Sequence, residues 1–113
     1  MNMIYKNSSD SYQTIGLNSK DKEIYSIISH YIKNNDNKLK EAGFESFMGF
    51  GKECTRIIHY NGVTLVMQIH LGSKSVKIKI AGKEKARKEV IGKLEKIMSL
   101  KFEEGDILLN NNS

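Results

Sequence analysis

Apolar and polar residues alternate strictly over much of the segment 54–80, which predicts three consecutive β-strands. Asn61-Gly62 favours a two-residue type I′ hairpin turn, and Gly72-Ser73 fits a type II′ turn. The two turns imply the same register for the middle strand. The pairs that they predict are Tyr60 with Val63, Ile58 with Leu65, Arg56 with Met67, Cys54 with Ile69, Leu71 with Lys74, Ile69 with Val76, Met67 with Ile78, and Leu65 with Ile80.

This register divides the predicted sheet into an apolar face and a mostly polar one. The apolar face collects Cys54, Ile58, Tyr60, Val63, Leu65, Met67, Ile69, Val76, Ile78 and Ile80. The polar face collects Thr55, Ile57, His59, Thr64, Val66, Gln68, His70, Ser75, Lys77 and Lys79. Arg56 interrupts the apolar face, and we expect its head group to reach water from an outer strand.

Two amphipathic helices flank the strands, because apolar residues recur there at helical spacing. The first helix is expected to start at Asn18 or Ser19, and the second to run from about 83 to 100. Their apolar stripes are Ile24, Ile27, Ile28, Tyr31 and Ile32 in the first, and Ala86, Val90, Ile91, Leu94, Ile97 and Met98 in the second. Since the sheet has one apolar face, both helices should pack on it and leave the lysine-bearing face open.

The predicted fold class is therefore α+β, a three-stranded antiparallel sheet with two helices packed on one face in the order α-β-β-β-α. Residues 1–18 are interpreted as an N-terminal arm, 19–101 as the domain, and 102–113 as an acidic and polar tail. "YQTIGL" in the arm is compatible with a short strand. "NNDN" ends the first helix, "KLKEAGF" adds a turn with Gly43 as its cap, and 44–51 forms a loop or short strand. That aromatic segment either covers the core or offers an exposed surface to a partner.

The charge is concentrated in one part of the chain. The 113 residues have a formal net charge of +5, and residues 51–102 alone carry +8. A concentrated basic segment is typical of proteins that bind polyanions. The single cysteine, the lack of an apolar leader and the lack of an apolar run of about 20 residues favour a cytoplasmic protein without a membrane partner.

Catalytic and metal-binding constellations are not indicated. The register sets His59 opposite Thr64 and His70 opposite Ser75, roughly 20 Å apart along the strands. Cys54 falls on the apolar face and is expected to act as a buried apolar residue. No glycine-rich phosphate loop or nucleophile signature occurs in the sequence. We therefore predict a non-enzymatic protein with no catalytic residues, metal or cofactor.

The candidate nucleic-acid-binding residues form two groups in the segment 75–90. Lys77 and Lys79 lie on the open sheet face, and the start of the last helix carries Lys83, Lys85, Arg87 and Lys88. Cations in a first helical turn oppose the helix dipole, which favours a role in binding a partner. The alternative is an ordinary solvated surface, since Glu84 and Lys88, Lys85 and Glu89, and Glu89 and Lys93 stand at i, i+4 spacing.

"KEKARKEVIGKL" at the start of the last helix, after a helix and three antiparallel strands, resembles the double-stranded-RNA-binding domain. The resemblance implies phosphate contacts from Lys83, Lys85 and Arg87, with Ala86, Val90, Ile91 and Leu94 on the buried side. HicA-like toxins share the topology, and "LKEAGF" with Gly51 is similar to their opening. The catalytic histidine of that family falls on Glu53 here, so the resemblance does not extend to ribonuclease activity. Integrase arm-binding domains are also similar, and they would imply DNA contacts from Lys77, Lys79, Gln68 and Thr64.

The sequence thus favours a small non-enzymatic nucleic-acid-binding protein that uses the outer sheet face and the N-terminus of the last helix. The alternative is a phage-type inhibitor or interaction protein that binds a host protein or sequesters an anionic small molecule. The choice between DNA, RNA, an anionic protein and a small-molecule ligand stays open, as does that between a monomer and a homodimer.

Overall fold

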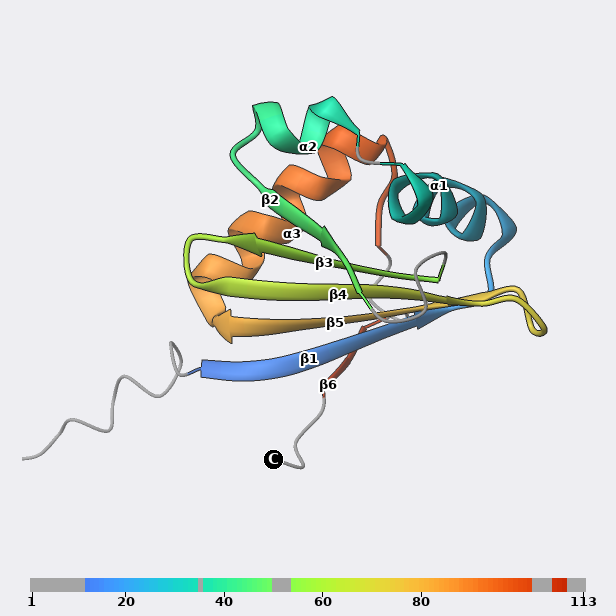
Figure 1. Cartoon of the computed structure of the whole chain (residues 1–113). Coiled ribbons are helices and arrows are strands. Elements are labelled where there is room, and N and C mark those ends of the chain that lie inside the picture. The colour runs from blue at the N-terminus through green and yellow to red at the C-terminus, as the bar shows by residue number, and fades with distance from the viewer. Residues whose placement is uncertain (1–11, 35, 50–53, 103–106, 110–113) are drawn as a thin grey trace, which may run out of the picture.

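A computed structural model describes residues 12–34, 36–49, 54–102 and 107–109 of the chain. Its elements in chain order are β1 (Tyr12–Ser19), α1 (Lys22–Lys33), α2 (Asn37–Glu41), β2 (Glu45–Met48), β3 (Thr55–Tyr60), β4 (Val63–His70), β5 (Ser75–Lys83), α3 (Glu84–Met98) and β6 (Ile107–Leu109). The strands form one antiparallel sheet in the order β2-β3-β4-β5-β1-β6 (Figure 1).

The fold is α+β with an antiparallel sheet, as predicted, but the prediction of three strands was wrong. The three predicted strands are β3, β4 and β5. The short β2 extends the sheet beside β3, and β1 pairs with β5 on the opposite side. The three-residue β6 pairs in turn with β1. Residues assigned to an N-terminal arm and to a C-terminal tail therefore belong to the sheet.

The predicted register of the central strands is confirmed at every pair within β3, β4 and β5. Asn61 and Gly62 have φ angles of 48° and 80°, as a type I′ turn requires. The type II′ turn expected at Gly72-Ser73 was wrong, because Gly72 does not have a positive φ. Residues 71–74 form a four-residue link instead, and its left-handed residue is Lys74, with φ of 51°.

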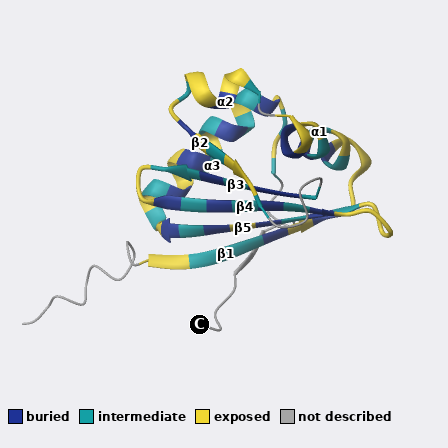
Figure 2. Ribbon diagram, in the orientation of Figure 1, coloured by how far each residue is buried: buried dark blue, intermediate teal, exposed yellow. Residues whose placement is uncertain are grey.

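Helices α1 and α3 cover the same face of the sheet, as expected (Figures 1 and 2). Apolar side chains of both helices share one core with Leu39 of α2 and with the inward residues of the strands. The most completely buried of these are Ile28, Ile32, Leu39, Ile58, Leu65, Met67, Leu94, Val63, Val76 and Val90. None of the described helices is long and apolar enough to cross a lipid bilayer.

Helix α1 starts later than the sequence suggested. Strand β1 continues to Ser19, and Asp21 then caps the helix by accepting hydrogen bonds from the backbone N–H groups of Glu23 and Ile24, at 2.9 and 3.0 Å. Asn18 and Ser19 are the last residues of the strand, so neither of them can be the helix cap. The difference arises because the strand pairing of β1 competes with the helix for these residues.

Helix α2 ends at a glycine cap, as predicted. Gly43 has φ of 93°, and the Phe44 N–H donates to the Leu39 carbonyl at 3.0 Å, which is the Schellman arrangement. Leu39 and Phe44 are both buried, so the cap also closes an apolar contact. The chain then enters β2, which confirms a short strand within the aromatic segment. Residues 50–53, including Gly51 and Glu53, lie outside the described residues.

Arg56 is buried, with 3% of its surface exposed, so the expectation that its head group reaches water was wrong. Strand β2 covers the edge at which Arg56 was expected to emerge. The Nε atom of Arg56 donates to the Ile32 carbonyl at 3.0 Å, and its Nη1 atom donates to the Ser46 hydroxyl at 2.8 Å. Burial lowers the pKa of Arg56, and the negative end of the α1 dipole, where the Ile32 carbonyl lies, offsets part of this desolvation.

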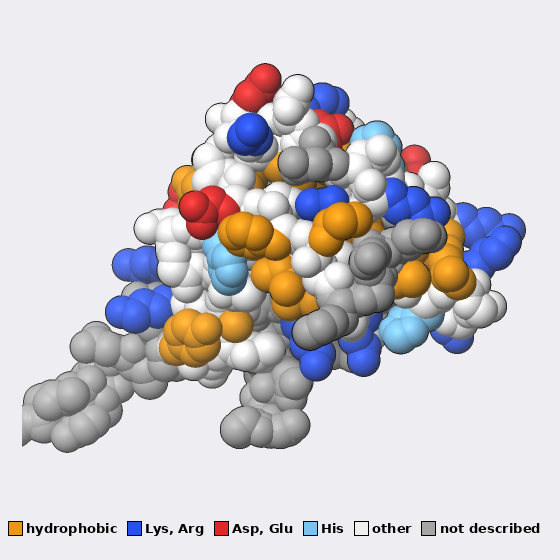
Figure 3. Space-filling model, viewed as in Figure 1, with side chains coloured by type: hydrophobic (Ala, Val, Ile, Leu, Met, Phe, Trp, Pro, Cys, Tyr) orange, Lys and Arg blue, Asp and Glu red, His pale blue; other side chains and the backbone are white. Residues whose placement is uncertain are grey.

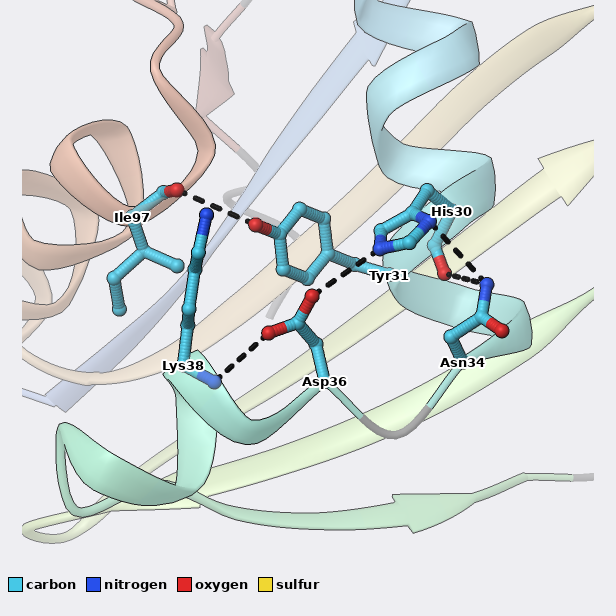
Figure 4. A network of polar contacts seen from close by, with 6 residues as sticks. All are labelled: His30, Tyr31, Asn34, Asp36, Lys38 and Ile97. Atoms are coloured by element: carbon cyan, nitrogen blue, oxygen red, sulfur yellow. Dashed lines mark hydrogen bonds and ion pairs between the residues drawn. The ribbon is translucent and has the colours of Figure 1, made fainter.

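A polar network holds the three helices together (Figure 4). The Tyr31 hydroxyl donates to the Ile97 carbonyl at 3.3 Å and so links α1 to α3. Asp36 caps α2 by accepting the Lys38 N–H at 2.8 Å, and its other oxygen lies 3.2 Å from Nε2 of His30. These two contacts hold the pKa of Asp36 below its ordinary value, the backbone N–H having the larger effect.

Candidate nucleic-acid interface

The face of the sheet away from the helices carries a row of lysines along β5. Alternation within the strand puts Lys77, Lys79 and Lys83 on this outer face, between the inward residues Val76, Ile78, Ile80 and Gly82. We call these three side chains the lysine row. It extends roughly 20 Å at about 3.3 Å per residue. The sequence assigned Lys83 to the start of the last helix. In the structure it is the last residue of β5 and also the N-cap of α3, so it connects the predicted sheet-face lysines with the predicted cations of the helix.

The lysine row is available to a ligand. Lys79 and Lys83 are exposed and Lys77 is half-buried. Within the described part of the chain, none of the three makes a hydrogen bond or an ion pair. Their charges are therefore not neutralised by neighbours that the structure describes.

The residues beside the lysine row are uncharged. Gln68 and Asn18 flank Lys77 on β4 and β1, and Val66 and Gly16 flank Lys79. Tyr12 stands opposite Lys83 and is 62% exposed. The one acidic residue of the described strands that shares this face is Glu45 on β2, three strands away from β5. Counting the described residues, the outer face is therefore electropositive around β5.

The start of α3 contributes fewer cations than the sequence suggested. Lys85 and Lys88 are exposed, but Lys88 pairs with Glu84 at 3.0 Å, as the i, i+4 spacing predicted. Lys83 is the N-cap residue, and its side chain makes no capping hydrogen bond. Lys85 and Lys88 therefore lie beside the end of the lysine row, and the ion pair with Glu84 partly neutralises Lys88.

Arg87 is buried, with 4% of its surface exposed, so the expectation that it lies on the surface at the start of the last helix was wrong. Its Nε donates to the Gly82 carbonyl at 3.0 Å, and its Nη2 donates to Oε1 of Gln13 at 3.4 Å. Arg87 thus occupies the buried side of α3 together with Val90 and Leu94. The physical reason is β1, which brings Gln13 over the position that the sequence left open to solvent.

Two aromatic residues, Tyr12 and Phe47, also lie on the outer face, and the sequence alone did not place either of them there. Phe47 is 49% exposed and packs edge-on against the ring of His59, with 5.7 Å between the ring centroids. Hydrophobic, histidine and lysine or arginine side chains lie side by side on the surface shown in Figure 3. The aromatic segment signalled Phe47, but only the β2–β3 register assigns it to this face.

The two strand histidines are far apart, as predicted. His59 lies opposite Thr64, whose Oγ1 is 3.0 Å from its Nδ1, and His70 lies opposite Ser75 at the other end of β4. The described residues contain no group of three or more His, Cys, Asp and Glu side chains that could hold a metal ion.

No protein-family model, no curated protein and no solved structure matches the chain.

Proposed function

We propose that the protein binds nucleic acid without catalysing a reaction, and that the outer sheet face is the contact surface. The observation that carries this proposal is the lysine row, three cations in line on an uncovered face with no ion-pair partner among the described residues. Lysines that neutralise phosphates release counterions, and this release supplies most of the non-specific affinity for nucleic acid.

The geometry favours a sheet-led mode of binding over a helix-led one. Arg87 is committed to internal hydrogen bonds and Lys88 to Glu84, which leaves the start of α3 with a supporting role. The polar side chains beside the lysine row, among them Gln68 and Asn18, can donate to phosphates, sugars or base edges. Lys85 extends the basic surface beyond Lys83.

The test compares a triple variant with a matched control. The first carries Lys77→Ala, Lys79→Ala and Lys83→Ala, and the second removes the exposed lysines Lys33, Lys38 and Lys40 on α1 and α2. Fluorescence anisotropy with a labelled 20-base-pair duplex and with its single strand, at 50 and 200 mM salt, measures the affinities. At 50 mM salt we expect the affinity of the first variant for nucleic acid to fall at least tenfold. The affinity of the control variant should fall less than threefold.

The salt dependence gives a second criterion. The logarithm of the association constant falls linearly with the logarithm of the salt concentration. Removing three phosphate contacts should make this slope less steep by about 2.7 for a duplex. An unchanged slope, or equal losses in the two variants, would refute the sheet-led mode. An affinity of the wild type that does not depend on salt would refute nucleic-acid binding through lysines altogether.

A second candidate function is that of an interaction protein, such as a phage-type inhibitor of a host protein. It is favoured by β2, a strand at the edge of the sheet on which Phe47 and Met48 are 49% and 54% exposed. Exposed apolar residues on an edge strand are typical of protein–protein contacts, including homodimers. Recovery of one stoichiometric protein partner, with a purified sample that lacks absorbance from nucleic acid at 260 nm, would support this candidate.

A further inference from the structure

An open hollow of about 460 Å³ lies at one end of the outer face, where β1 ends beside the connection between β4 and β5. Six of its lining residues matter for what it can bind, and they are Asn18, Ser19, Lys20, His70, Ser75 and Lys77. Pockets of roughly 300–1,000 Å³ are the usual size for small-molecule ligands. The hollow is therefore large enough for a nucleotide.

Three side chains that can carry positive charge converge on the hollow from different segments. Lys77 comes from β5, His70 from the end of β4, and Lys20 from the link between β1 and α1. None of them forms an ion pair within the described residues. The neighbouring carboxylate of Asp21 is occupied by the N–H groups at the start of its own helix. The hollow should therefore attract an anion.

Neutral donors accompany these cations. The Ser19 hydroxyl is buried and accepts the Asp21 N–H at 3.1 Å, and its own proton is given to no other described residue. Ser75 shares a hydrogen bond of 2.7 Å with Ser73, and the exposed side chain of Asn18 offers an amide N–H₂ group. An anion with several acceptor oxygens could thus be bound by charge and by hydrogen bonds together.

We propose that this hollow binds the phosphate group of a nucleotide. Phosphate carries up to two negative charges and three strong acceptor oxygens. A site with two lysines, a histidine and neutral donors therefore suits a phosphate better than a carboxylate. Lysine binds phosphate as a point charge. Lys77 belongs both to the hollow and to the lysine row. A nucleic-acid strand bound along β5 would therefore bring one of its phosphates to the hollow. In that respect the inference rests on the proposed function.

Titration of the ¹⁵N-labelled protein with inorganic phosphate and with adenosine 5′-monophosphate tests the site directly, with sodium chloride at equal ionic strength as the salt control. We expect both phosphates to shift backbone amide signals of residues 18–20 and 75–77. Lys20→Ala should weaken both affinities at least fivefold. Lys40→Ala on α2, which removes another exposed lysine, should leave them unchanged. Shifts no larger than those in chloride, or equal affinities in the two variants, would overturn the proposal.

Competition with the labelled single strand distinguishes the two sources of phosphate. If adenosine 5′-monophosphate displaces the strand, and Lys20→Ala weakens both, the hollow holds a phosphate of the bound strand. If the strand binds but neither small phosphate does, the hollow proposal fails and nucleic-acid binding stands. If the small phosphates bind and no strand does, the hollow is a site for a free phosphorylated ligand and the proposed function fails.

Discussion

Arg87 donates a hydrogen bond from Nε to the carbonyl oxygen of Gly82, 3.0 Å away, and thereby fastens the first turn of α3 to the end of β5. The second hydrogen bond of its guanidinium, to Gln13, ties β1 to the same point. A cation that appears in the sequence as part of a basic surface therefore acts as an internal link between three elements.

Replacing Arg87 should lower stability rather than affinity for nucleic acid. We expect Arg87→Met to reduce the free energy of unfolding by about 2 kcal/mol, because hydrogen bonds from a buried charged group are lost. Urea denaturation measures this change. Under conditions where the variant is fully folded, its affinity for the duplex should stay within threefold of the wild type. A large loss of affinity with normal stability would instead make Arg87 a contact residue.

Arg56 should show a graded response to substitution. Arg56→Ala leaves the Ile32 carbonyl without its partner and creates a cavity, so we expect a loss of about 3 kcal/mol in the free energy of unfolding. Arg56→Met refills most of the volume and should cost less, about 1–2 kcal/mol. Chemical denaturation of both variants decides the point, and equal stability of Arg56→Ala and the wild type would show that the buried guanidinium contributes nothing.

The contacts of Asp36 predict a dependence of stability on pH. Its pKa lies below the ordinary value of 3.8, so the folded protein holds the carboxylate more strongly ionised than the unfolded chain does. The resulting stabilisation is complete above the ordinary pKa and is lost as the pH falls through the lower pKa of the folded state. Asp36→Asn should therefore be less stable than the wild type at pH 6, and the difference should shrink below pH 3.8. Thermal unfolding across this range measures it, and a difference independent of pH would contradict the assignment.

Two glycines should respond in opposite directions to alanine. A Cβ atom at Gly82 would lie 2.9 Å from Cγ2 of Val63, so Gly82→Ala forces overpacking and should cost about 1–3 kcal/mol. Gly92 is a helical residue of α3 with nothing within 4 Å of such an atom. Gly92→Ala should therefore stabilise the protein by about 0.5–1 kcal/mol. Melting temperatures of the two variants should thus move apart, and a destabilised Gly92→Ala would contradict the helix assignment there.

The central hairpins could be predicted from the sequence because their information is local. Asn61-Gly62 favours one turn, and the alternation on either side of it specifies which residues face the core. The predicted register of β4 and β5 was correct even though the predicted turn type was wrong. Pairing Leu71 with Lys74 leaves the same alignment of His70 with Ser75 for either turn conformation.

The "YQTIGL" segment was compatible with a short strand, but the pairing of β1 with β5 and the burial of the two arginines could not be predicted from local pattern. In β1 only Ile15 and Leu17 are large aliphatic residues, too few for a clear alternation, and the partner strand lies far along the chain. Arg56 and Arg87 become buried because β2 and β1 cover them, so their environments follow from tertiary contacts. The same limitation applies to the hollow, whose lining joins three segments that are separate in the sequence.

The position of β1 in the sheet also has a consequence for how the chain folds. Tyr12 pairs with Lys83, so the first strand of the domain finds its partner only after most of the domain has left the ribosome. The hairpins β3–β4 and β4–β5 close through short links and can form early, whereas β1 must close a long loop. We therefore expect β1 to dock late in synthesis, and until it does one edge of β5, the strand that carries the lysine row, stays unpaired.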